Sequence, residues 1–354
     1  MAEKVLVAGG GFLGVNVALG LASEKEVVLV DEDLSHVFVP GLVDVLRGRF
    51  SVDSLTLDLK DFMDGCGVEL VEGRVREVDA GEKKLILDDR VLGYDSLVLG
   101  LGGRVRSFGV DISDAFDVWN VEGVERLKSE MDKAESCVVV GSGYLGVEVA
   151  GELAETGVST TVVEAAERPM PQLSRSASGS VLETLNSLDV DFLGGREVVE
   201  IDGGKVFFRS GESIEADIAV WCGGVEASYV VQDSLDADAS GLEVDKRLRS
   251  VEHEDIFAGG DNADTGEKKT AHNAMEQADV IVENLLGGEK KISGSKAPLI
   301  ASVGDTGFIV QGGRILWNGF PSRRLKDLVR VFYIARLKWR RLVQCRVPSL
   351  TRSS

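Results

Sequence analysis

The sequence of 354 residues has few cysteines and histidines. The four cysteines form no CxxC motif and no pair close in sequence; they are Cys66, Cys137, Cys222 and Cys345. Cys137 and Cys222 lie in apolar runs, where cysteine acts as a small buried residue. Cytosolic, reducing conditions fit this pattern best. None of the three histidines is spaced as a metal ligand, so we predict no metal site.

Two further absences narrow the function. We expect no signal peptide, because the apolar N-terminal run is itself the first strand of a glycine motif. The net charge of -20 makes nucleic acid an unfavourable partner. The charge is uneven, however: residues 1–294 hold 57 acids and 27 bases, whereas residues 295–354 hold 2 acids and 12 bases. This asymmetry predicts a basic segment with its own partner, and the acidic body leaves a high-salt cytoplasm open.

The most informative feature is a sequence that occurs twice. The first copy, residues 5–31, reads VLVAGGGFLGVNVALGLASEKEVVLVD, and the second, residues 137–164, reads CVVVGSGYLGVEVAGELAETGVSTTVVE. Each copy has the order strand, glycine turn, helix, strand, acid. The three glycines and the final acid of the first copy are Gly9, Gly11, Gly14 and Asp31, and those of the second are Gly141, Gly143, Gly146 and Glu164. This is the full context of a dinucleotide-binding motif.

Each glycine of the motif has a physical role. The first permits a tight turn, the second lets the backbone approach a pyrophosphate, and the third lets the helix pack on the strand. The helix N-terminus offers N–H groups to the phosphates. A carboxylate at Asp31 or Glu164 would bond a ribose diol and repel a 2′-phosphate, which favours NAD over NADP. The alternative is a glycine turn that only packs a helix on a strand.

The order of elements predicts an α/β fold with two Rossmann-like dinucleotide-binding domains, the second inserted in the first, and a C-terminal amphipathic helical tail. We place the first domain at residues 1–111 and 233–294, the second at 112–232 and the tail at 295–354. Turn signals predict a small antiparallel sheet in residues 68–92, and residues 32–48 read as a loop leading into a helix. Periodicity predicts helices at residues 120–134, 175–187 and 270–286.

Six segments together resemble the two-dinucleotide flavoproteins, and within them the type II NADH dehydrogenases, which are NADH:quinone oxidoreductases. The segments are GGGFLG at 9–14 with Asp31, HVFVP at 36–40, YDSLVLGLGG at 94–103, GSGYLGVEVAGELAE at 141–155, VWCGGV at 220–225 and DIFAGGDNA at 255–263. The resemblance covers nearly the whole chain. It is most specific to the subfamily through Trp221 and the tail.

The resemblance implies a cofactor assignment for each motif. FAD would be held by Gly9, Gly11, Gly14 and Asp31, with Gly102 against it and Asp261 on its ribityl or pyrophosphate part. NADH would be held by Gly141, Gly143, Gly146 and Glu164. The same motifs place Gly224 and Ala271 among the cofactor-binding residues. For Asp261, helix N-capping is an alternative that looks the same in sequence.

One segment departs from the family pattern. Relatives that reduce quinone usually carry Ala-Gln-x-Ala-x-Gln where the flavin meets the quinone. Here residues 271–276 read Ala-His-Asn-Ala-Met-Glu, with Gln277 one place later. The roles of His272 and Glu276, and the type of quinone, stay open. The resemblance also implies that the helix starting near Thr270 points its N-terminus at the flavin, where a positive dipole end would stabilise an anionic reduced ring.

The two copies differ at one instructive position. Asn16 of the first copy corresponds to Glu148 of the second, which predicts a carboxylate in the first turn of the NAD-side helix, where nicotinamide and flavin meet. We predict that Glu148 is catalytic: it positions the nicotinamide or carries a proton, as the resemblance also implies. The alternative is an acid favoured by the helix dipole.

The basic tail carries an amphipathic pattern at residues 321–343. Eight bases and Asp327 stand among apolar residues at helical spacing; the apolar residues are Leu325, Leu328, Val329, Phe332, Ala335, Trp339 and Leu342. Charges at a bilayer centre cost about 2.5–3.5 kcal/mol each, so spanning is opposed by roughly 20 kcal/mol. We predict instead a helix lying on an anionic membrane surface. The alternative is that the apolar stripe packs on the body or on another subunit.

The leading hypothesis is therefore an FAD-dependent enzyme that moves electrons from NADH to a membrane quinone, peripheral on the inner, cytoplasmic face of the cell membrane. A sulfide:quinone oxidoreductase is an alternative that would share the tail and the quinone, but it needs a cysteine pair beside the flavin, and no pair here is placed for that. A disulfide reductase needs a CxxxxC after the first glycine helix, which the chain lacks. A soluble NADH-dependent reductase of an electron carrier and a non-catalytic FAD/NADH redox sensor remain alternatives, and a homodimer stays open.

Overall fold

Two parallel sheets form the centre of the computed structural model, which describes residues 3–294 and 297–345. The first has the order β20 (Ile256–Ala258), β9 (Ser96–Leu99), β1 (Lys4–Ala8), β2 (Glu26–Asp31), β5 (Val68–Glu72). The second has the order β13 (Asp191–Leu193), β12 (Ser159–Val163), β11 (Ser136–Val140), β17 (Ile218–Trp221). Since β20 returns to the first sheet after the second is complete, one unit is inserted in the other.

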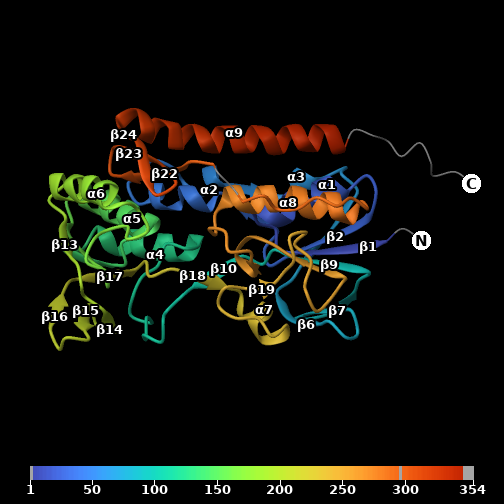
Figure 1. Cartoon of the computed structure of the whole chain (residues 1–354), viewed down its shortest axis with the longest axis horizontal. Helices are drawn as coiled ribbons and strands as arrows, with labels where there is room; N and C mark the ends of the chain where they lie inside the picture. Colours follow the sequence, from blue (N-terminus) through green and yellow to red (C-terminus); the bar gives the residue numbers. More distant parts are fainter. Residues whose placement is uncertain (1–2, 295–296, 346–354) are drawn as a thin grey trace, which may run out of the picture.

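Helices cover both sheets on the side that faces the top of Figure 1. The two glycine-motif helices are α1 (Phe12–Leu21) and α5 (Tyr144–Ala154), and the others are α4 (Val121–Met131), α6 (Arg175–Ser187) and α8 (Ala271–Leu285). Helix α1 is buried along almost its whole length, because sheet, α8 and the C-terminal helix enclose it. This confirms the predicted fold class and its helices; the domain boundaries at 111, 232 and 294 stay predictions.

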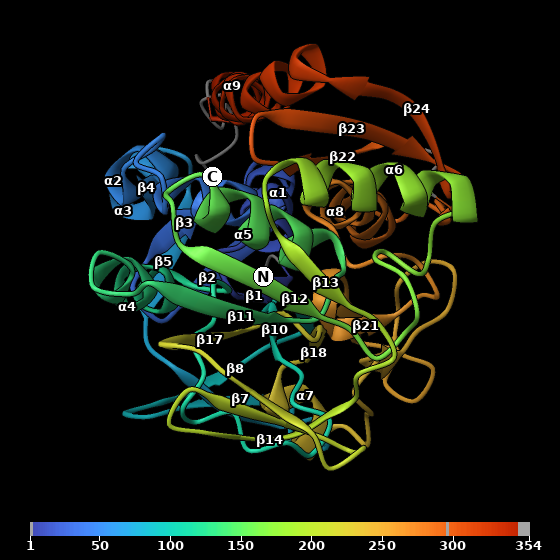
Figure 2. The ribbon, with the colours of Figure 1, turned by 90° about the vertical axis from the view of Figure 1, so that its left-hand side faces the viewer.

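Smaller elements complete the two units, as Figure 2 shows below the parallel sheets. Two antiparallel sheets are β6 (Val75–Asp79), β7 (Lys84–Leu87), β8 (Val91–Gly93) and β14 (Val198–Asp202), β15 (Lys205–Phe208), β16 (Ser213–Glu215). The connections between the units pair as β10 (Gly103–Val105) with β18 (Val225–Ala227). The remaining short elements are β3 (Ser35–Val37), η1 (Val39–Val45), α2 (Val52–Leu55), β4 (Thr56–Asp58), α3 (Leu59–Met63), α7 (Tyr229–Ser234), β19 (Leu242–Glu243), η2 (Gly260–Asn262) and β21 (Ala263–Asp264).

Two local predictions need correction. Only β6 to β8 form the antiparallel sheet predicted for residues 68–92, since β5 pairs in parallel with β2. The helical connection from β2 through η1 and α3 returns the chain in the same direction, which parallel pairing requires. Residues 32–48, predicted as a loop leading into a helix, hold strand β3 within the expected loop and then a helix of the 3-10 type, η1.

The tail contains a sheet that the sequence pattern did not reveal. Strands β22 (Leu299–Val303), β23 (Thr306–Gln311) and β24 (Arg314–Gly319) form an antiparallel meander, and α9 (Phe320–Gln344) follows. Helix α9 confirms the predicted amphipathic helix at 321–343. It runs along the length of the molecule above α1 and α8 (Figure 1). No helix in residues 3–294 and 297–345 is long and apolar enough to cross a bilayer.

A disulfide joins Cys66, which follows α3, to Cys345 at the end of α9. The two cysteines are 279 residues apart in sequence, so the lack of closely spaced cysteines did not exclude a disulfide. The bond is also not what the expected reducing conditions favour. Cys137 and Cys222 are free and buried, as predicted for small core residues.

We expect Cys345→Ser to lower the free energy of unfolding by about 2–4 kcal/mol, because the bond closes a very long loop of the unfolded chain. Denaturant unfolding of native and variant protein measures this difference. A reductant should bring the native protein to the level of the variant and leave the variant unchanged. Finding four titratable thiols in the denatured, unreduced native protein would show that no disulfide exists.

Candidate active site at two glycine turns

The two glycine turns have the same atomic structure. Gly9 N donates to Val30 O at 2.7 Å, and Gly141 N donates to Val163 O at 2.8 Å. Gly9 and Gly141 have positive φ of 101° and 95°. A Cβ on Gly14 or Gly146 would collide with the carbonyl oxygen of the first glycine of its own turn. Both turns therefore require glycine at the first and third positions.

The acid after each motif holds its own turn. Asp31 accepts a hydrogen bond from Gly10 N at 2.7 Å, and Glu164 accepts from Ser142 N at 2.8 Å and Ser142 Oγ at 2.6 Å. Burial raises the pKa of Asp31 to about 6, opposed by the Gly10 N–H and reinforced by Asp33. Each carboxylate thus lies beside the turn that would bind a pyrophosphate, at the end of the strand where the motif locates the ribose.

Open space lies over both turns. A Cβ on Gly143 would meet no atom within 4 Å, and one on Gly11 would meet only Gly100 O at 3.9 Å. Gly102 and Gly224 have positive φ of 70° and 137°, and a Cβ on either would also meet nothing within 4 Å. At these four glycines the space beside the backbone is open, as close approach of a ligand requires; their role in cofactor binding stays a prediction.

The chain returns to the first site at residues 259–263. Burial raises the pKa of Asp261, opposed by Lys269 and by the backbone of Gly103. The 3-10 helix η2 is capped by Gly259 without a side-chain bond, so the N-cap alternative does not apply to Asp261 there. Asn262 is fully buried and donates to Gly102 O at 2.7 Å, while its Oδ1 has no partner in the part of the chain that the structure describes. A free acceptor in this place suits a ligand hydroxyl.

Helix α8 starts beside this segment. Thr270 caps it by accepting from Asn273 N, and Ala271 is its first residue. Gln277 Oε1 accepts a hydrogen bond from Gly260 N at 2.7 Å, which joins α8 to the 3-10 helix η2 that contains Asp261. His272 and Glu276 lie one turn apart with Nε2 and Oε1 3.4 Å apart, too weakly aligned for a hydrogen bond. The predicted placement of the α8 N-terminus at the cofactor site is thus consistent with its neighbours.

Glu148 is the fifth residue of α5, so it lies in the second helical turn and not in the predicted first turn. Its carboxylate accepts from Ser302 N at 3.0 Å and from Lys326 Nζ at 2.8 Å. Ser302 comes from β22 and Lys326 from α9. Glu148 is therefore a buried carboxylate paired with a cation, and a preference for the helix dipole does not account for it. Its catalytic role stays a prediction.

Helix α9 contributes contacts that the motifs did not suggest. Arg340 donates to Asn16 Oδ1 at 2.7 Å, and Asn16 is the fifth residue of α1. The two equivalent positions of the glycine helices, Asn16 and Glu148, thus each receive a base from α9. In the sequence, these contacts correspond only to two bases 14 residues apart on one helix, a pattern too common to predict them.

A buried hydrogen-bond chain connects α9 to the first turn. Tyr333 OH lies 2.7 Å from His36 Nε2, and His36 Nδ1 lies 2.9 Å from Gly10 O. Since Gly10 O can only accept, Nδ1 carries the proton and Nε2 accepts from the tyrosine hydroxyl. Burial lowers the pKa of His36 to about 4 and raises the pKa of Tyr333. His36 is therefore neutral in the folded protein.

These features define a class: a two-dinucleotide α/β protein whose glycine turns, strand-end acids and buried returning segment fit a flavin and a pyridine nucleotide. The family model described as pyridine nucleotide-disulphide oxidoreductase matches residues 3–278. The chain belongs to this family and is an oxidoreductase, with FAD and NADH as its cofactor pair.

Named relatives agree with the resemblance drawn from the motifs. The chain is 27% identical to the type II NADH:quinone oxidoreductase of Staphylococcus haemolyticus, covering 81% of this chain and 83% of that protein. Its fold matches NDH2 of Plasmodium falciparum, solved with NADH, with a TM-score of 0.84, 16% identity and 98% of each chain covered. It also matches a ferredoxin reductase of Rhodopseudomonas palustris, with a TM-score of 0.79, 25% identity and 88% and 82% covered.

We expect low pH to reduce the contribution of neutral His36 to the free energy of unfolding. The folded pKa of about 4 lies below the ordinary 6.5, so this contribution is complete above about pH 6.5 and falls as the pH drops toward 4. Asp31, whose pKa is raised, changes stability in the opposite sense. Comparison with His36→Gln cancels that effect, because both proteins keep Asp31.

Denaturant unfolding of the native protein and His36→Gln at a series of pH values measures the difference. The native advantage should shrink by about 2–3 kcal/mol between about pH 7 and pH 4.5. A difference that does not change with pH would mean that His36 titrates equally in folded and unfolded protein.

Proposed function

We propose that the chain oxidises NADH and passes the electrons through FAD to a membrane quinone. The observation that carries this proposal is the position of Glu148, buried where the NAD-side helix, the tail sheet and α9 meet. The staphylococcal relatives named type II NADH:quinone oxidoreductase support it over 81% of this chain. FAD, when bound, supplies a hydride acceptor for NADH and a two-electron donor for the quinone.

The residues around each turn have distinct tasks in this proposal. The turn of Gly9 to Gly14 binds the pyrophosphate of FAD at the N-terminus of α1, with Asp31 on the ribose. The turn of Gly141 to Gly146 binds NADH in the same way, with Glu164 on its ribose. Gly102, Gly224, Asp261 and Ala271 line the space between the two sites and exclude water from it.

Glu148 orients the nicotinamide carboxamide or carries a proton between solvent and the acceptor. Its bond to Lys326 holds the carboxylate in one position, since both side chains are only 11% exposed. A quinone takes up two protons with two electrons. His272 and Glu276, which replace the usual two glutamines, put two titratable groups at the first turns of α8, where the resemblance locates the acceptor.

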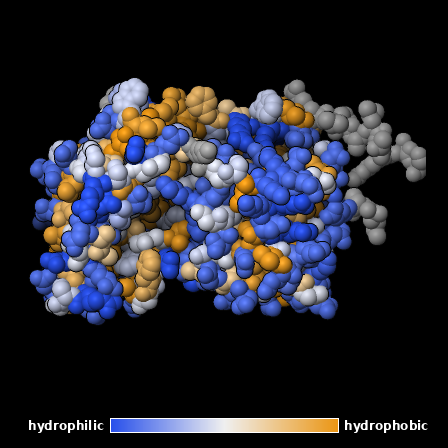
Figure 3. Space-filling view, viewed as in Figure 1, coloured by the Kyte–Doolittle hydropathy of each residue, from blue (hydrophilic) through white to orange (hydrophobic). Residues whose placement is uncertain are grey.

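The outer face of α9 supports membrane attachment. All seven residues of the predicted apolar stripe are exposed, among them Phe332 at 68% and Trp339 at 64%. On β24, Leu316 and Trp317 are exposed as well, and Figure 3 shows hydrophobic surface gathered over β24 and the start of α9. We therefore place the protein on an anionic membrane surface through residues 321–343, on the inner face of the cell membrane.

The bases of α9 contact the body of the protein more than the sequence suggested. The charge of the tail was expected to exceed what a packed helix needs, yet most of the eight bases contact the body, among them Arg323, Lys326, Arg330, Arg336, Arg340 and Arg341. The inward face also packs Tyr333 and Leu337. Membrane attachment thus rests on the exposed apolar residues together with the bases that border them.

The proposal predicts that NADH bleaches the flavin of the purified protein under anaerobic conditions and that a quinone restores its colour. Steady-state NADH oxidation with a quinone measures the complete reaction, and ferricyanide serves as the control acceptor. Flavin that is not bleached by NADH would favour a redox sensor. Bleaching by sulfide in place of NADH would favour a sulfide:quinone oxidoreductase. NADH oxidation that proceeds with a ferredoxin but not with a quinone as acceptor would favour a carrier reductase.

Glu148→Gln should slow NADH-to-flavin or flavin-to-quinone transfer about tenfold or more, because a positioned acid or base is lost while the amide keeps the bond to Ser302. Stopped-flow absorbance resolves the two half-reactions. Glu155→Gln is the matched control, since it removes a salt-bridging carboxylate from the end of the same helix, 3.3 Å from Arg47. Equal rates in native protein and Glu148→Gln would leave Glu148 a structural role only.

A further inference from the structure

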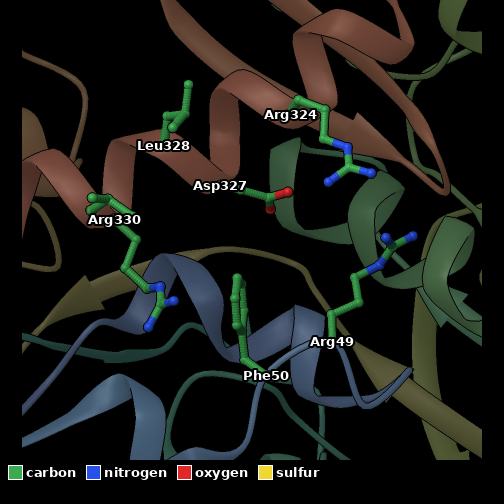
Figure 4. A pocket seen from close by; sticks show the side chains of 7 residues that line it. Arg49, Phe50, Arg324, Asp327, Leu328 and Arg330 are labelled. Atoms are coloured by element: carbon green, nitrogen blue, oxygen red, sulfur yellow. The ribbon is translucent and has the colours of Figure 1, made fainter.

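A cavity of about 480 Å³ opens between α9 and the loop after η1. Its lining is Arg49, Phe50, Arg324, Asp327, Leu328, Arg330 and Val331. Figure 4 shows the guanidinium groups of Arg49 and Arg324 facing one another at one end, and Arg330 reaching from α9 down beside Phe50 at the other. Three arginines therefore surround one space, and none of them belongs to the cofactor turns.

Arg330 brings a positive charge without a carboxylate partner among the described residues. Its guanidinium stacks 4.3 Å over the Phe50 ring, and Nη1 donates to Ser54 O at 2.9 Å. Its Nε has no partner in the part of the chain that the structure describes. The side chain is thus held in place by an aromatic ring and a carbonyl group while its charge still lacks a nearby anion.

The opposite end of the cavity is fixed by the body of the protein. Arg49 Nε donates to Glu152 Oε2 at 3.1 Å and its Nη2 to Asp305, so two carboxylates hold the guanidinium in place. Asp327 projects into the space between the ends (Figure 4), but its carboxylate accepts from Arg323 at 2.7 Å. The charged residues of the lining are therefore three arginines and Asp327, and the carboxylate of Asp327 already bonds Arg323.

The cavity also joins the exposed apolar face of α9. Leu328 is 47% exposed and Val331 is 55% exposed, and both border the cavity and the apolar stripe. A ligand that fits both parts needs an anionic head for planar guanidinium donors and an apolar body beside it. Guanidinium forks match phosphate oxygens in geometry and charge. A phospholipid has both parts in the required order.

We propose that this cavity binds the phosphodiester of one anionic phospholipid between Arg324, Arg330 and Arg49, with its acyl chains along Leu328 and Val331. The inference rests on the proposed membrane attachment and makes it specific, because it assigns a single lipid site to a helix that otherwise binds a charged surface in general. The bound lipid would hold α9 at a defined depth, since its headgroup phosphate marks the bilayer interface.

The test is a calorimetric titration with dihexanoyl-phosphatidylglycerol kept below its micelle concentration. The full-length native protein should bind one molecule, and R324Q and R330Q should each weaken binding about tenfold or more, because each loses a charge-assisted pair. K338Q is the matched control: Lys338 is an exposed base on the same helix outside the cavity. It should weaken binding less than about twofold. NADH oxidation with ferricyanide checks that the variants are folded.

Three results would overturn the lipid site. They are equal weakening by K338Q and R324Q, equal binding of dihexanoyl-phosphatidylcholine, and binding of inorganic phosphate as tight as that of the lipid. Co-sedimentation with vesicles of phosphatidylglycerol and phosphatidylcholine separates this outcome from failure of the membrane proposal. If the native protein stays in the supernatant at low salt, as protein truncated at residue 320 is expected to do, membrane attachment itself is contradicted. If the native protein and the R324Q and R330Q variants pellet equally, only the lipid site is contradicted.

Discussion

The rest of the structure depends on the crossing of α9 over both glycine-motif helices. Lys326 of α9 bonds Glu148 on α5, and Arg340 of α9 bonds Asn16 on α1, so one helix holds the same position in both repeats. Fourteen residues of α-helix span about 21 Å, a length that side chains cannot change. Since α1 packs on the first sheet and α5 on the second, α9 sets the distance between the two nucleotide turns. Electron transfer between two cofactors needs that distance to be constant.

Buried charges determine the position in which α9 packs on the body more than they increase the stability of that packing. Arg323 and Asp44 form an ion pair in which each side chain is 2% exposed. Such a pair gains little over apolar residues of the same size, because both ions lose their hydration, but removal of one partner is costly. A shift of α9 by one turn would leave Asp44, Glu148 and the bases facing them unpaired in the protein interior. The ion pairs therefore select one register of the helix among several that apolar packing alone would allow.

The sequence predicts what is local and misses what joins distant segments. The glycine spacing, the strand-end acids and the return at residues 255–263 were sufficient for the fold, because each motif specifies its own turn. The pairing of Glu148 with Ser302 and Lys326, and of Cys66 with Cys345, joins residues more than 150 positions apart, and no periodicity records it. The sheet β22 to β24 was not predicted, because strands of five or six residues give little periodic signal.

The two faces of α9 connect the proposed membrane attachment to the nucleotide sites. Its outward face carries the apolar stripe, while its inward face carries Tyr333, which bonds His36 and through it the carbonyl group of Gly10 in the first glycine turn. A helix is stiff over this length, so its inward contacts form or break together. Separation of Lys326 from Glu148 without movement of Tyr333 would require a bend in α9. The interior of α9 has no proline or glycine that would provide such a bend. Undocking would also expose the unpaired acids Asp44 and Glu148, each of which is buried when α9 is in place. Under the proposed membrane attachment, a force on the outer face would therefore be transmitted to both turns at once, because the helix that carries the exposed apolar stripe is the same helix that contacts both glycine-motif helices.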